Sequence, residues 1–178
     1  MVKNGEQHIK SLQDGRSIYL NGEVIKDVTR NPAFRNACQS AAAMYDFQAN
    51  PDNIESLTFK LDNSDTRSNI AWQMPTSYEE MVHRRKGLMA MAETHGGFFG
   101  RSPDHVASAL SGQIMGLDQF EGYDKGYAKN FREYFNYARE QDLFLTYVII
   151  NPQVNRSKAP SEMDTDAVMR VVDEDDTG

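Results

Sequence analysis

The sequence contains one cysteine, Cys38, so no disulfide can form within the chain. Proteins of oxidising compartments commonly depend on disulfides, whereas a lone thiol is typical of the reducing cytoplasm, where we expect this protein to lie. Cys38 stands in an alanine-rich stretch that favours a helix. An inert, buried thiol is therefore a better interpretation than a nucleophile.

Other absences exclude further classes of protein. No apolar run approaches the roughly 20 residues that a membrane-spanning helix needs, and the opening MVKNGEQHIK lacks the apolar core of a signal peptide. The formal net charge of -7 argues against a basic surface for nucleic acid. No metal triad occurs at a recognisable spacing, and His8 and His83 have polar neighbours, so we expect both to be solvated. We therefore expect no membrane, nucleic-acid or metal partner.

What is present predicts a mainly helical chain with inserted β-strands. The length of 178 residues suffices for one domain with a sizeable core. Helical spacing and capping residues predict helices over residues 6–13, 31–45, 76–92, 103–115 and 124–140. Apolar and β-branched runs predict strands over residues 17–20, 23–25, 58–61, 70–74, 143–150 and 167–173. Asn21-Gly22 predicts a hairpin turn between the first two strands. Residues 62–68 and 116–123 are expected to be irregular.

Two of the helices carry patterns that predict which face is buried. Thr76 and Glu79, three residues apart, predict a capping box at the start of the third helix. The face that we expect this helix to bury consists of Tyr78, Met81, Val82, Leu88, Met89 and Ala92. The last helix has an aromatic stripe, which we interpret as core packing rather than as a cofactor site: Tyr127, Phe131, Tyr134, Phe135 and Ala138.

The first candidate site follows the strand predicted over residues 143–150. The stretch LFLTYVIINPQVNRSK breaks at Asn151-Pro152, because proline cannot donate to a sheet ladder. A dense polar set comes directly after the break: Gln153, Asn155, Arg156, Ser157 and Lys158. Polar groups at the end of a buried strand commonly hold a ligand, and two cations favour an anionic group such as a phosphate. The alternative is a solvated turn.

The second candidate site is the glycine-rich segment HGGFFGRSPDH, residues 95–105. Ser102 and Pro103 are typical of a helix start, so Arg101 would lie beside exposed N–H groups that favour a carboxylate or phenolate. Gly96, Gly97 and Gly100 would let the backbone approach a flat ligand, and Phe98 and Phe99 offer ring surfaces. The alternative is a tight helix-entry turn with Arg101 in solvent.

The motifs GRSPDH and INPQVNRSK together resemble the 4-hydroxyphenylacetate 3-hydroxylase family, the oxygenase component of two-component FADH2-dependent flavin monooxygenases. The segments Gly15–Asp46 and Val171–Gly178 (VVDEDDTG) are similar to the same family. The resemblance implies an acyl-CoA dehydrogenase-like N-terminal helical domain at residues 1–142. Residues 143–178 would then be the start of a central β-barrel domain, truncated here. A truncated chain should expose apolar surface that a missing helical bundle would cover.

The resemblance also implies a reaction. A separate flavin reductase would supply FADH2, which reacts with dioxygen to form a flavin C4a-hydroperoxide. This species hydroxylates, or oxidatively substitutes, a phenol such as 4-hydroxyphenylacetate ortho to its hydroxyl group. The family implies a cytoplasmic homo-oligomer, a dimer or tetramer. The catalytic base is unknown and expected beyond Gly178.

By resemblance, six residues would bind the substrate: Arg101, Ser102, Pro103, Asp104, His105 and Tyr147. Seven would bind FAD: Tyr147, Val148, Ile149, Gln153, Val154, Asn155 and Arg156. His105 stands where the family usually has a tyrosine, and Tyr147 where it usually has a histidine. Both departures fall in the phenol pocket, so the substrate could equally be a halogenated or nitro-substituted phenol.

Two other interpretations remain open at this stage. A 4-hydroxybutyryl-CoA dehydratase-like protein would share the fold, but it binds a [4Fe–4S] cluster through cysteines, and Cys38 is the only thiol. A non-catalytic helical interaction domain would need neither cofactor nor substrate.

Overall fold

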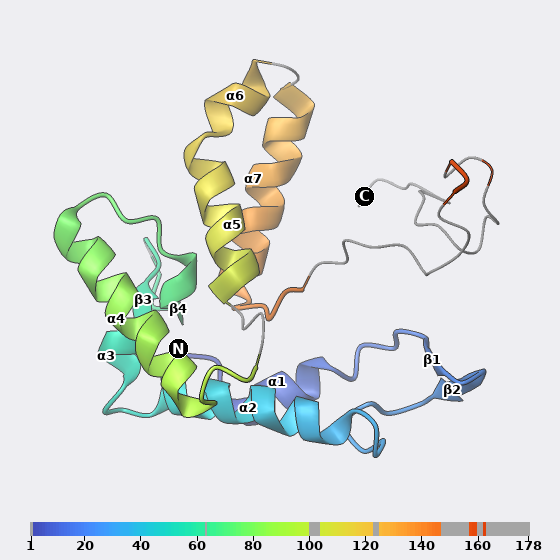
Figure 1. The fold of residues 1–178 in the computed structure, drawn as a ribbon. Coiled ribbons are helices and arrows are strands. Elements are labelled where there is room, and N and C mark those ends of the chain that lie inside the picture. Colours follow the sequence, from blue (N-terminus) through green and yellow to red (C-terminus); the bar gives the residue numbers. More distant parts are fainter. Residues whose placement is uncertain are drawn as a thin grey trace. The chain divides into compact units, whose positions relative to one another are not determined.

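The computed structural model describes residues 2–62, 64–99, 104–122, 125–146, 157–159 and 162. The chain divides into two compact units, Met1–Leu145 and Thr146–Gly178. The helices and strands named below all lie in the first unit (Figure 1). None of the helices that the described residues form is both long enough and apolar enough to span a bilayer.

The N-terminal part consists of a capped helix and a hairpin, both as predicted. Helix α1 (Gly5–Ser11) begins at Asn4, whose side chain accepts the Gln7 N–H while the Gln7 side chain accepts the Asn4 N–H, each at 2.9 Å. Strands β1 (Ile18–Leu20) and β2 (Glu23–Ile25) pair antiparallel. The turn between them has φ of 52° at Asn21 and 82° at Gly22, the left-handed pair that favours Asn-Gly.

Helix α2 (Arg35–Ala49) begins later and runs further than predicted. The Asn31 side chain accepts the Ala33 N–H at 2.9 Å, which makes residues 31–34 a turn rather than the first helical residues. Helix α1 packs against α2, and there the ring of His8 stacks on that of Tyr45 at 4.6 Å. The expectation that His8 is solvated is therefore wrong. Burial, helped by the nearby Lys3, lowers the pKa of His8 to about 4.

A small sheet follows α2 and the short helix α3 (Ile54–Leu57). Strands β3 (Thr58–Lys60) and β4 (Arg67–Asn69) pair antiparallel. Strand β4 was not predicted, because it lies in the stretch interpreted as a polar loop. The strand predicted over residues 70–74 is wrong: Ile70–Trp72 forms the 3-10 helix η1, in which the Asn69 side chain accepts the Ala71 N–H. A side-chain cap thus overrides the β-favouring composition.

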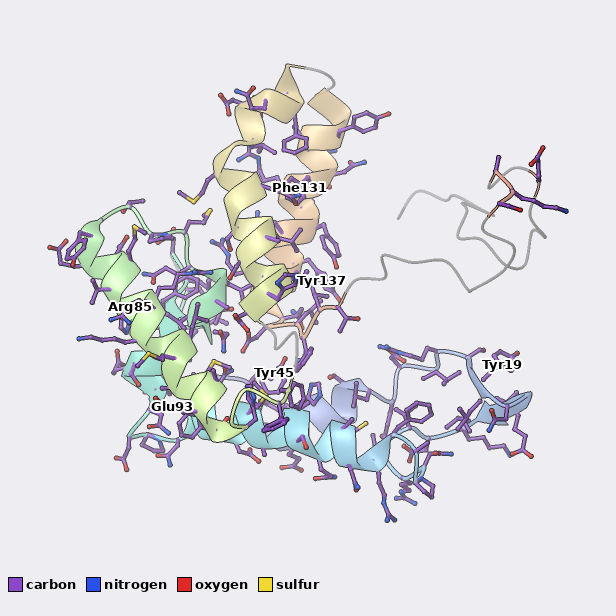
Figure 2. The ribbon with its side chains drawn as sticks, viewed as in Figure 1. Tyr19, Tyr45, Arg85, Glu93, Phe131 and Tyr137 are labelled. Carbon is purple, nitrogen blue, oxygen red and sulfur yellow. The ribbon has the colours of Figure 1, made fainter. Side chains whose placement is uncertain are left out.

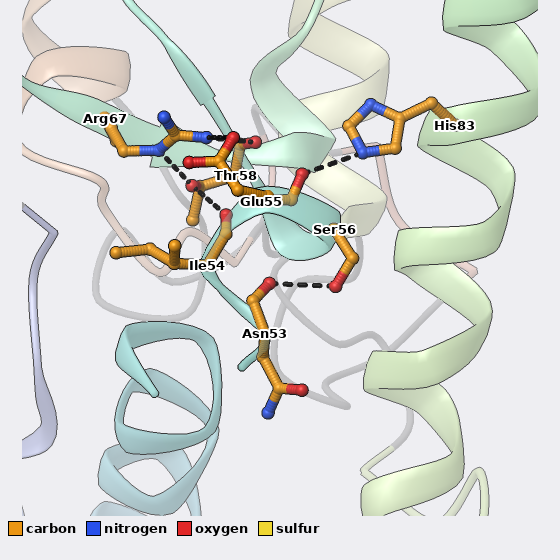
Figure 3. A network of polar contacts seen from close by, with 7 residues as sticks. All are labelled: Asn53, Ile54, Glu55, Ser56, Thr58, Arg67 and His83. Carbon is orange, nitrogen blue, oxygen red and sulfur yellow. Dashed lines mark hydrogen bonds and ion pairs between the residues drawn. The ribbon is translucent and has the colours of Figure 1, made fainter. Parts of the chain in front are cut away.

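Polar contacts join this sheet to α3 and the next helix (Figure 3). Arg67 pairs with Glu55 at 2.9 Å and donates from Nε to the Thr58 hydroxyl at 2.7 Å. The ring of His83 meets the Glu55 carbonyl oxygen at 3.0 Å, so His83 also has a protein partner. These contacts hold α3 between the sheet and α4.

Helix α4 (Tyr78–Thr94) is capped one residue later than predicted. Ser77 accepts the Glu80 N–H at 3.1 Å, and the Glu80 carboxylate accepts the Thr76 N–H at 2.6 Å. Its predicted buried face is wrong in part: Leu88 packs against the core, but Tyr78, Met81 and Met89 are among the exposed apolar side chains. The helix instead buries Gly87 and Met91, since the small Gly87 allows close approach to α3.

The remaining helices are α5 (Asp104–Met115), α6 (Leu117–Glu121) and α7 (Lys125–Glu140). Helix α6 corrects the prediction of an irregular stretch over residues 116–123. Helices α5 and α7 lie side by side (Figure 1). Phe135 and Ala138 are buried as predicted, but Tyr127 and Tyr134 are exposed, so the aromatic stripe is only partly core.

Two apolar clusters form the core. The first is centred on Trp72 and Phe135, whose rings meet edge to face at 5.8 Å, and Leu143 and Leu145 pack against it. The second contains Met44, Leu57 and Met91, and Phe99 is among the side chains that pack against it. Residues 143–146 form no strand, and the rest of the strand predicted over 143–150 lies outside the described residues, as does the one over 167–173.

Several aromatic side chains remain on the surface. Tyr19 on β1 and Tyr137 on α7 are labelled in Figure 2, and both are more than half exposed, at 68% and 56%. Apolar side chains of α4 are exposed as well, among them Tyr78, Met81 and Met89.

Candidate functional site

Most of the predicted site residues lie outside the described part of the chain. These are Arg101, Ser102 and Pro103 of the predicted substrate site and all of the predicted flavin residues, Tyr147, Val148, Ile149, Gln153, Val154, Asn155 and Arg156. Only Asp104 and His105 are described. The roles of Arg101 in binding substrate and of Arg156 in binding FAD therefore stay predictions. What the structure describes is the framework on either side of the two loops.

Asp104 opens helix α5, where a carboxylate complements the positive end of the helix dipole. Burial lowers the pKa of Arg84 on α4, and the negative charge of Asp104 opposes this lowering. One Arg84 nitrogen donates both to the Ala71 carbonyl oxygen at 2.9 Å and to the Ser108 hydroxyl at 2.6 Å. Arg84 on α4 thus connects η1 and α5 through one guanidinium nitrogen.

Sequence reasoning missed Arg84, because it stands in a run of charged residues on a helix and has no distinguishing neighbour. His105, predicted to line the phenol pocket, follows Asp104 in the first turn of α5 and is exposed. Among the described residues, the His105 side chain therefore lies on the surface at the start of α5.

The glycine-rich loop begins with a turn built on His95, the C-cap of α4. Gly96 and Gly97 have φ of 59° and 76°, which explains why both are glycine. The Phe99 N–H donates to His95 Nδ1 at 3.2 Å, so the neutral ring carries its proton on Nε2. Within the described residues, Nε2 is buried and has no hydrogen-bond partner. His95 thus organises the loop itself, in addition to capping the helix.

The two phenylalanines of the loop behave differently. Phe98 is 94% exposed, whereas Phe99 turns inward onto the second core cluster. The Phe99 ring lies 5.6 Å from that of His95 and 5.6 Å from that of Phe144. Phe144 belongs to the segment that leads into residues 147–156. The glycine-rich segment and the segment before residue 147 therefore contact each other through Phe99 and Phe144, which are 45 residues apart in the sequence.

A buried polar network lies at the start of the segment before residue 147. Asp142, just after α7, is 3% exposed, and burial raises the pKa of its carboxyl group. Its carboxylate accepts from Gln48 Nε2 at 2.5 Å and from the Asn69 N–H at 3.2 Å. Its carbonyl oxygen accepts from the Tyr45 hydroxyl at 2.7 Å. This network was not predicted, since its members are dispersed in the sequence.

A pocket of ≈ 580 Å³ lies beside this network and is lined in part by His8, Asp142 and Phe144. Each of its three cations already has a partner in the protein. Lys3 donates to the carbonyl oxygens of Gln141 and Asp142, Arg16 pairs with Asp14, and Arg67 pairs with Glu55. The pocket therefore offers little to a phosphate and does not stand in for the predicted flavin site.

The described residues contain no cluster of three or more His, Cys, Asp or Glu side chains that could hold a metal ion. Cys38 is partly buried in α2, with Sγ 3.8 Å from the Val28 carbonyl oxygen, and burial raises its pKa. This agrees with an inert thiol.

Comparison with known proteins finds relatives that are named as oxygenase components of monooxygenases. A family model described as "4-hydroxyphenylacetate 3-hydroxylase N terminal" matches residues 4–178. The chain is 33% identical over 174 residues to the 4-hydroxyphenylacetate 3-monooxygenase oxygenase component of Geobacillus sp. (strain PA-9), covering 97% of this chain and 35% of the relative. It is 34% identical over 175 residues to the oxygenase component of 4-nitrophenol 2-monooxygenase from Rhodococcus sp., covering 98% and 33%.

Solved structures agree with the sequence matches. A crystal structure of the oxygenase component of 4-hydroxyphenylacetate 3-monooxygenase, complexed with FAD and 4-hydroxyphenylacetate, matches with a TM-score of 0.80 at 31% identity, over 90% of this chain and 33% of that one. An archaeal 4-hydroxybutyryl-CoA dehydratase from N. maritimus matches with a TM-score of 0.73 at 24% identity, over 99% and 35%, which shows likeness of fold alone. The chain spans about a third of the length of these relatives. The predicted fold class, an acyl-CoA dehydrogenase-like helical domain, is confirmed.

Proposed function

Because this chain belongs to the 4-hydroxyphenylacetate 3-hydroxylase N-terminal family, we propose that it is the N-terminal third of a reduced-FAD-dependent monooxygenase that hydroxylates a phenol ortho to its hydroxyl group. The observation that carries the proposal is the contact between Phe99 and Phe144. Phe99 lies two residues before Arg101, which would bind the phenol, and Phe144 lies three residues before the segment that would bind the flavin. The helical domain would cover residues 1–142 and the β domain would begin at 143, which the division of the chain after Leu145 supports.

The residues of the second loop suit FAD chemically. Gln153, Asn155 and Arg156 supply amide and guanidinium donors, which fit pyrophosphate and ribose oxygens. The chemistry that reduced FAD supplies when bound is the two-electron activation of dioxygen, from which one oxygen atom goes to the aromatic ring and the other to water. The protein's own task is to hold the phenol, favour its anion and keep water out.

In the first loop, Arg101 would hold the phenolate by a charge-assisted hydrogen bond. The His95 turn fixes where this loop begins, and Asp104 opens the helix that follows the loop. The chain before Arg101 is thus held in place before a substrate binds, which lowers the entropic cost of binding.

The substrate need not be 4-hydroxyphenylacetate. His105 and Tyr147 differ from the family's usual residues at the phenol pocket, and a relative that is 34% identical is named as acting on 4-nitrophenol. We therefore include nitro-substituted and halogenated phenols. A separate flavin reductase, a cytoplasmic setting and assembly into a homo-oligomer belong to the same proposal.

The direct test is product analysis of the full-length protein with reduced FAD, dioxygen and a panel of phenols. We expect an ortho-hydroxylated product from at least one phenol. Failure of the folded protein to bind reduced FAD or to form any product would favour the non-catalytic interaction domain.

Replacing Arg101 by alanine in the full-length protein is expected to weaken phenol binding by about 1.5–3 kcal/mol, the scale of a lost charge-assisted hydrogen bond. Calorimetric titration with the best substrate measures the effect. Arg85→Ala is the matched control, because Arg85 is exposed on α4. Unchanged phenol affinity in Arg101→Ala would remove Arg101 from the pocket.

Replacing Arg156 by alanine is expected to weaken the binding of reduced FAD, because a buried phosphate or ribose oxygen would lose its charged donor. Anaerobic fluorescence titration at fixed ionic strength gives the dissociation constant. Arg35→Ala removes the same charge from an exposed site at the start of α2. Equal dissociation constants for the two variants would contradict the assignment of Arg156.

A further inference from the structure

The end of helix α7 has an unusual backbone. Asp142 has φ of 46°, in the left-handed region that residues other than glycine seldom occupy, although Asp and Asn do so more often than most. The Asp142 N–H donates to the Arg139 carbonyl oxygen at 3.2 Å, and the Leu143 N–H donates to that of Ala138 at 3.0 Å. The left-handed residue thus closes α7 and sets the direction in which the chain continues.

The Asp142 side chain accepts two hydrogen bonds from neighbouring groups that can only donate. Asn69 Oδ1 accepts the Ala71 N–H at 2.8 Å, so Asn69 Nδ2 must donate, and it does so to Gln48 Oε1 at 2.7 Å. Gln48 therefore presents Nε2 to Asp142. The second carboxylate oxygen meets the Asn69 N–H. Both neighbours are donors, and only a side chain with two acceptors satisfies them.

The residue also holds the main chain on its other side. The Asp142 carbonyl oxygen accepts from the Tyr45 hydroxyl and, at 3.4 Å, from Lys3 Nζ. Four partners from the N-terminus, α2 and β4 thus converge on one residue. The next three residues carry Leu143 and Leu145 into the first core cluster and Phe144 onto Phe99.

We propose that Asp142 is a positioning residue for flavin binding: its buried carboxylate fixes the exit of the chain from α7 and so holds the segment that leads into residues 147–156. This inference rests on the proposed function, because it assigns that segment to the flavin. It goes beyond it, since Asp142 lies outside both predicted loops in the sequence and would act through Leu143–Leu145.

The hydrogen-bond pattern allows the role of Asp142 to be tested by one disruptive substitution and one compensating substitution. In Asp142→Asn, an NH2 group must face either Gln48 Nε2 or the Asn69 N–H, and both are donors. Asparagine keeps the size of the side chain and tolerates the left-handed backbone. In the double variant Gln48→Glu/Asp142→Asn, the new carboxylate at position 48 accepts from the new amide at position 142 and from Asn69 Nδ2, so every donor again has an acceptor. The negative charge then lies at position 48 instead of position 142, and the hydrogen bonds between the three side chains are restored.

We expect Asp142→Asn in the full-length protein to bind reduced FAD at least about tenfold more weakly, the scale of one unsatisfied buried donor. The double variant should return to within about twofold of the wild type. Tyr45→Phe, which removes only the bond to the Asp142 carbonyl oxygen, should give a smaller loss of flavin affinity. Anaerobic titrations at a temperature where circular dichroism shows each variant folded measure all three.

Leu117→Ala controls for loss of stability, because Leu117 is buried in α6 and belongs to neither the network nor the two core clusters. Its flavin affinity should match the wild type. Positioning by Asp142 is overturned if Asp142→Asn binds flavin normally, if Leu117→Ala weakens binding equally, or if the folded double variant stays weak. A wild type that fails to bind reduced FAD would instead overturn the proposed function.

Discussion

Replacing Trp72 by alanine is expected to lower the free energy of unfolding by about 3–5 kcal/mol, the usual cost of truncating a large buried aromatic side chain. Trp72 is 1% exposed and meets Phe135 edge to face, so the variant loses both burial and a ring contact. Because Leu143 and Leu145 pack against the same cluster, the stem of the predicted flavin loop should loosen as well.

Urea denaturation followed by circular dichroism measures the change in stability. Tyr19→Ala is the control, because Tyr19 is an exposed aromatic residue on the hairpin. A Trp72→Ala variant within about 1 kcal/mol of the wild type would contradict the assignment of Trp72 to the centre of the core.

Replacing Gly87 by valine is expected to destabilise the protein by about 3 kcal/mol, the upper range for overpacking. A Cβ atom at this position would lie 2.6 Å from the Ser56 carbonyl oxygen and 2.8 Å from Ile70 Cγ2. The first is backbone and the second belongs to a fully buried side chain, so neither can move easily. Helix α4 would have to shift, and with it the His95 turn at its end.

Gly112→Val is a closely matched control, since Gly112 is also within a helix and a Cβ atom there would meet nothing within 4 Å. Valine and glycine have similar helix propensities, so the control should change stability by less than about 0.5 kcal/mol. Thermal denaturation of the two variants side by side gives the comparison. Equal melting temperatures would show that α4 does not pack closely through Gly87.

Features that depend on neighbouring residues could be predicted from the sequence. The hairpin follows from Asn21-Gly22, and α7 follows from its aromatic spacing, because turn geometry and helical period are local properties. The predictions were wrong where the local structure or the buried face depends on a side-chain contact or on a residue distant in the sequence. A hydrogen bond from the Ala71 N–H to the Asn69 side chain stabilises η1 where a strand was predicted. Helix α4 packs closely through Gly87, which the positions of its apolar residues did not indicate.

The candidate site shows the same division. The resemblance to a family supplied Arg101 and Arg156, which stay predictions, and the glycine-rich loop was recognised from its composition. The frame around the loops could not be predicted, because Arg84 and Asp142 are distinguished only by their partners in space. The sequence likewise does not indicate a role for Phe144, whose ring contacts that of Phe99 in the structure.

The Asp142 network also constrains when this unit can be completed during synthesis. Its partners Lys3, Tyr45, Gln48 and Asn69 stand 139, 97, 94 and 73 positions before it in the chain. A ribosome releases all four long before it releases Asp142, so they wait with their polar groups in water. The Asp142 network can form only when nearly the whole first unit has emerged from the ribosome. Its formation is therefore a late and non-local step in folding.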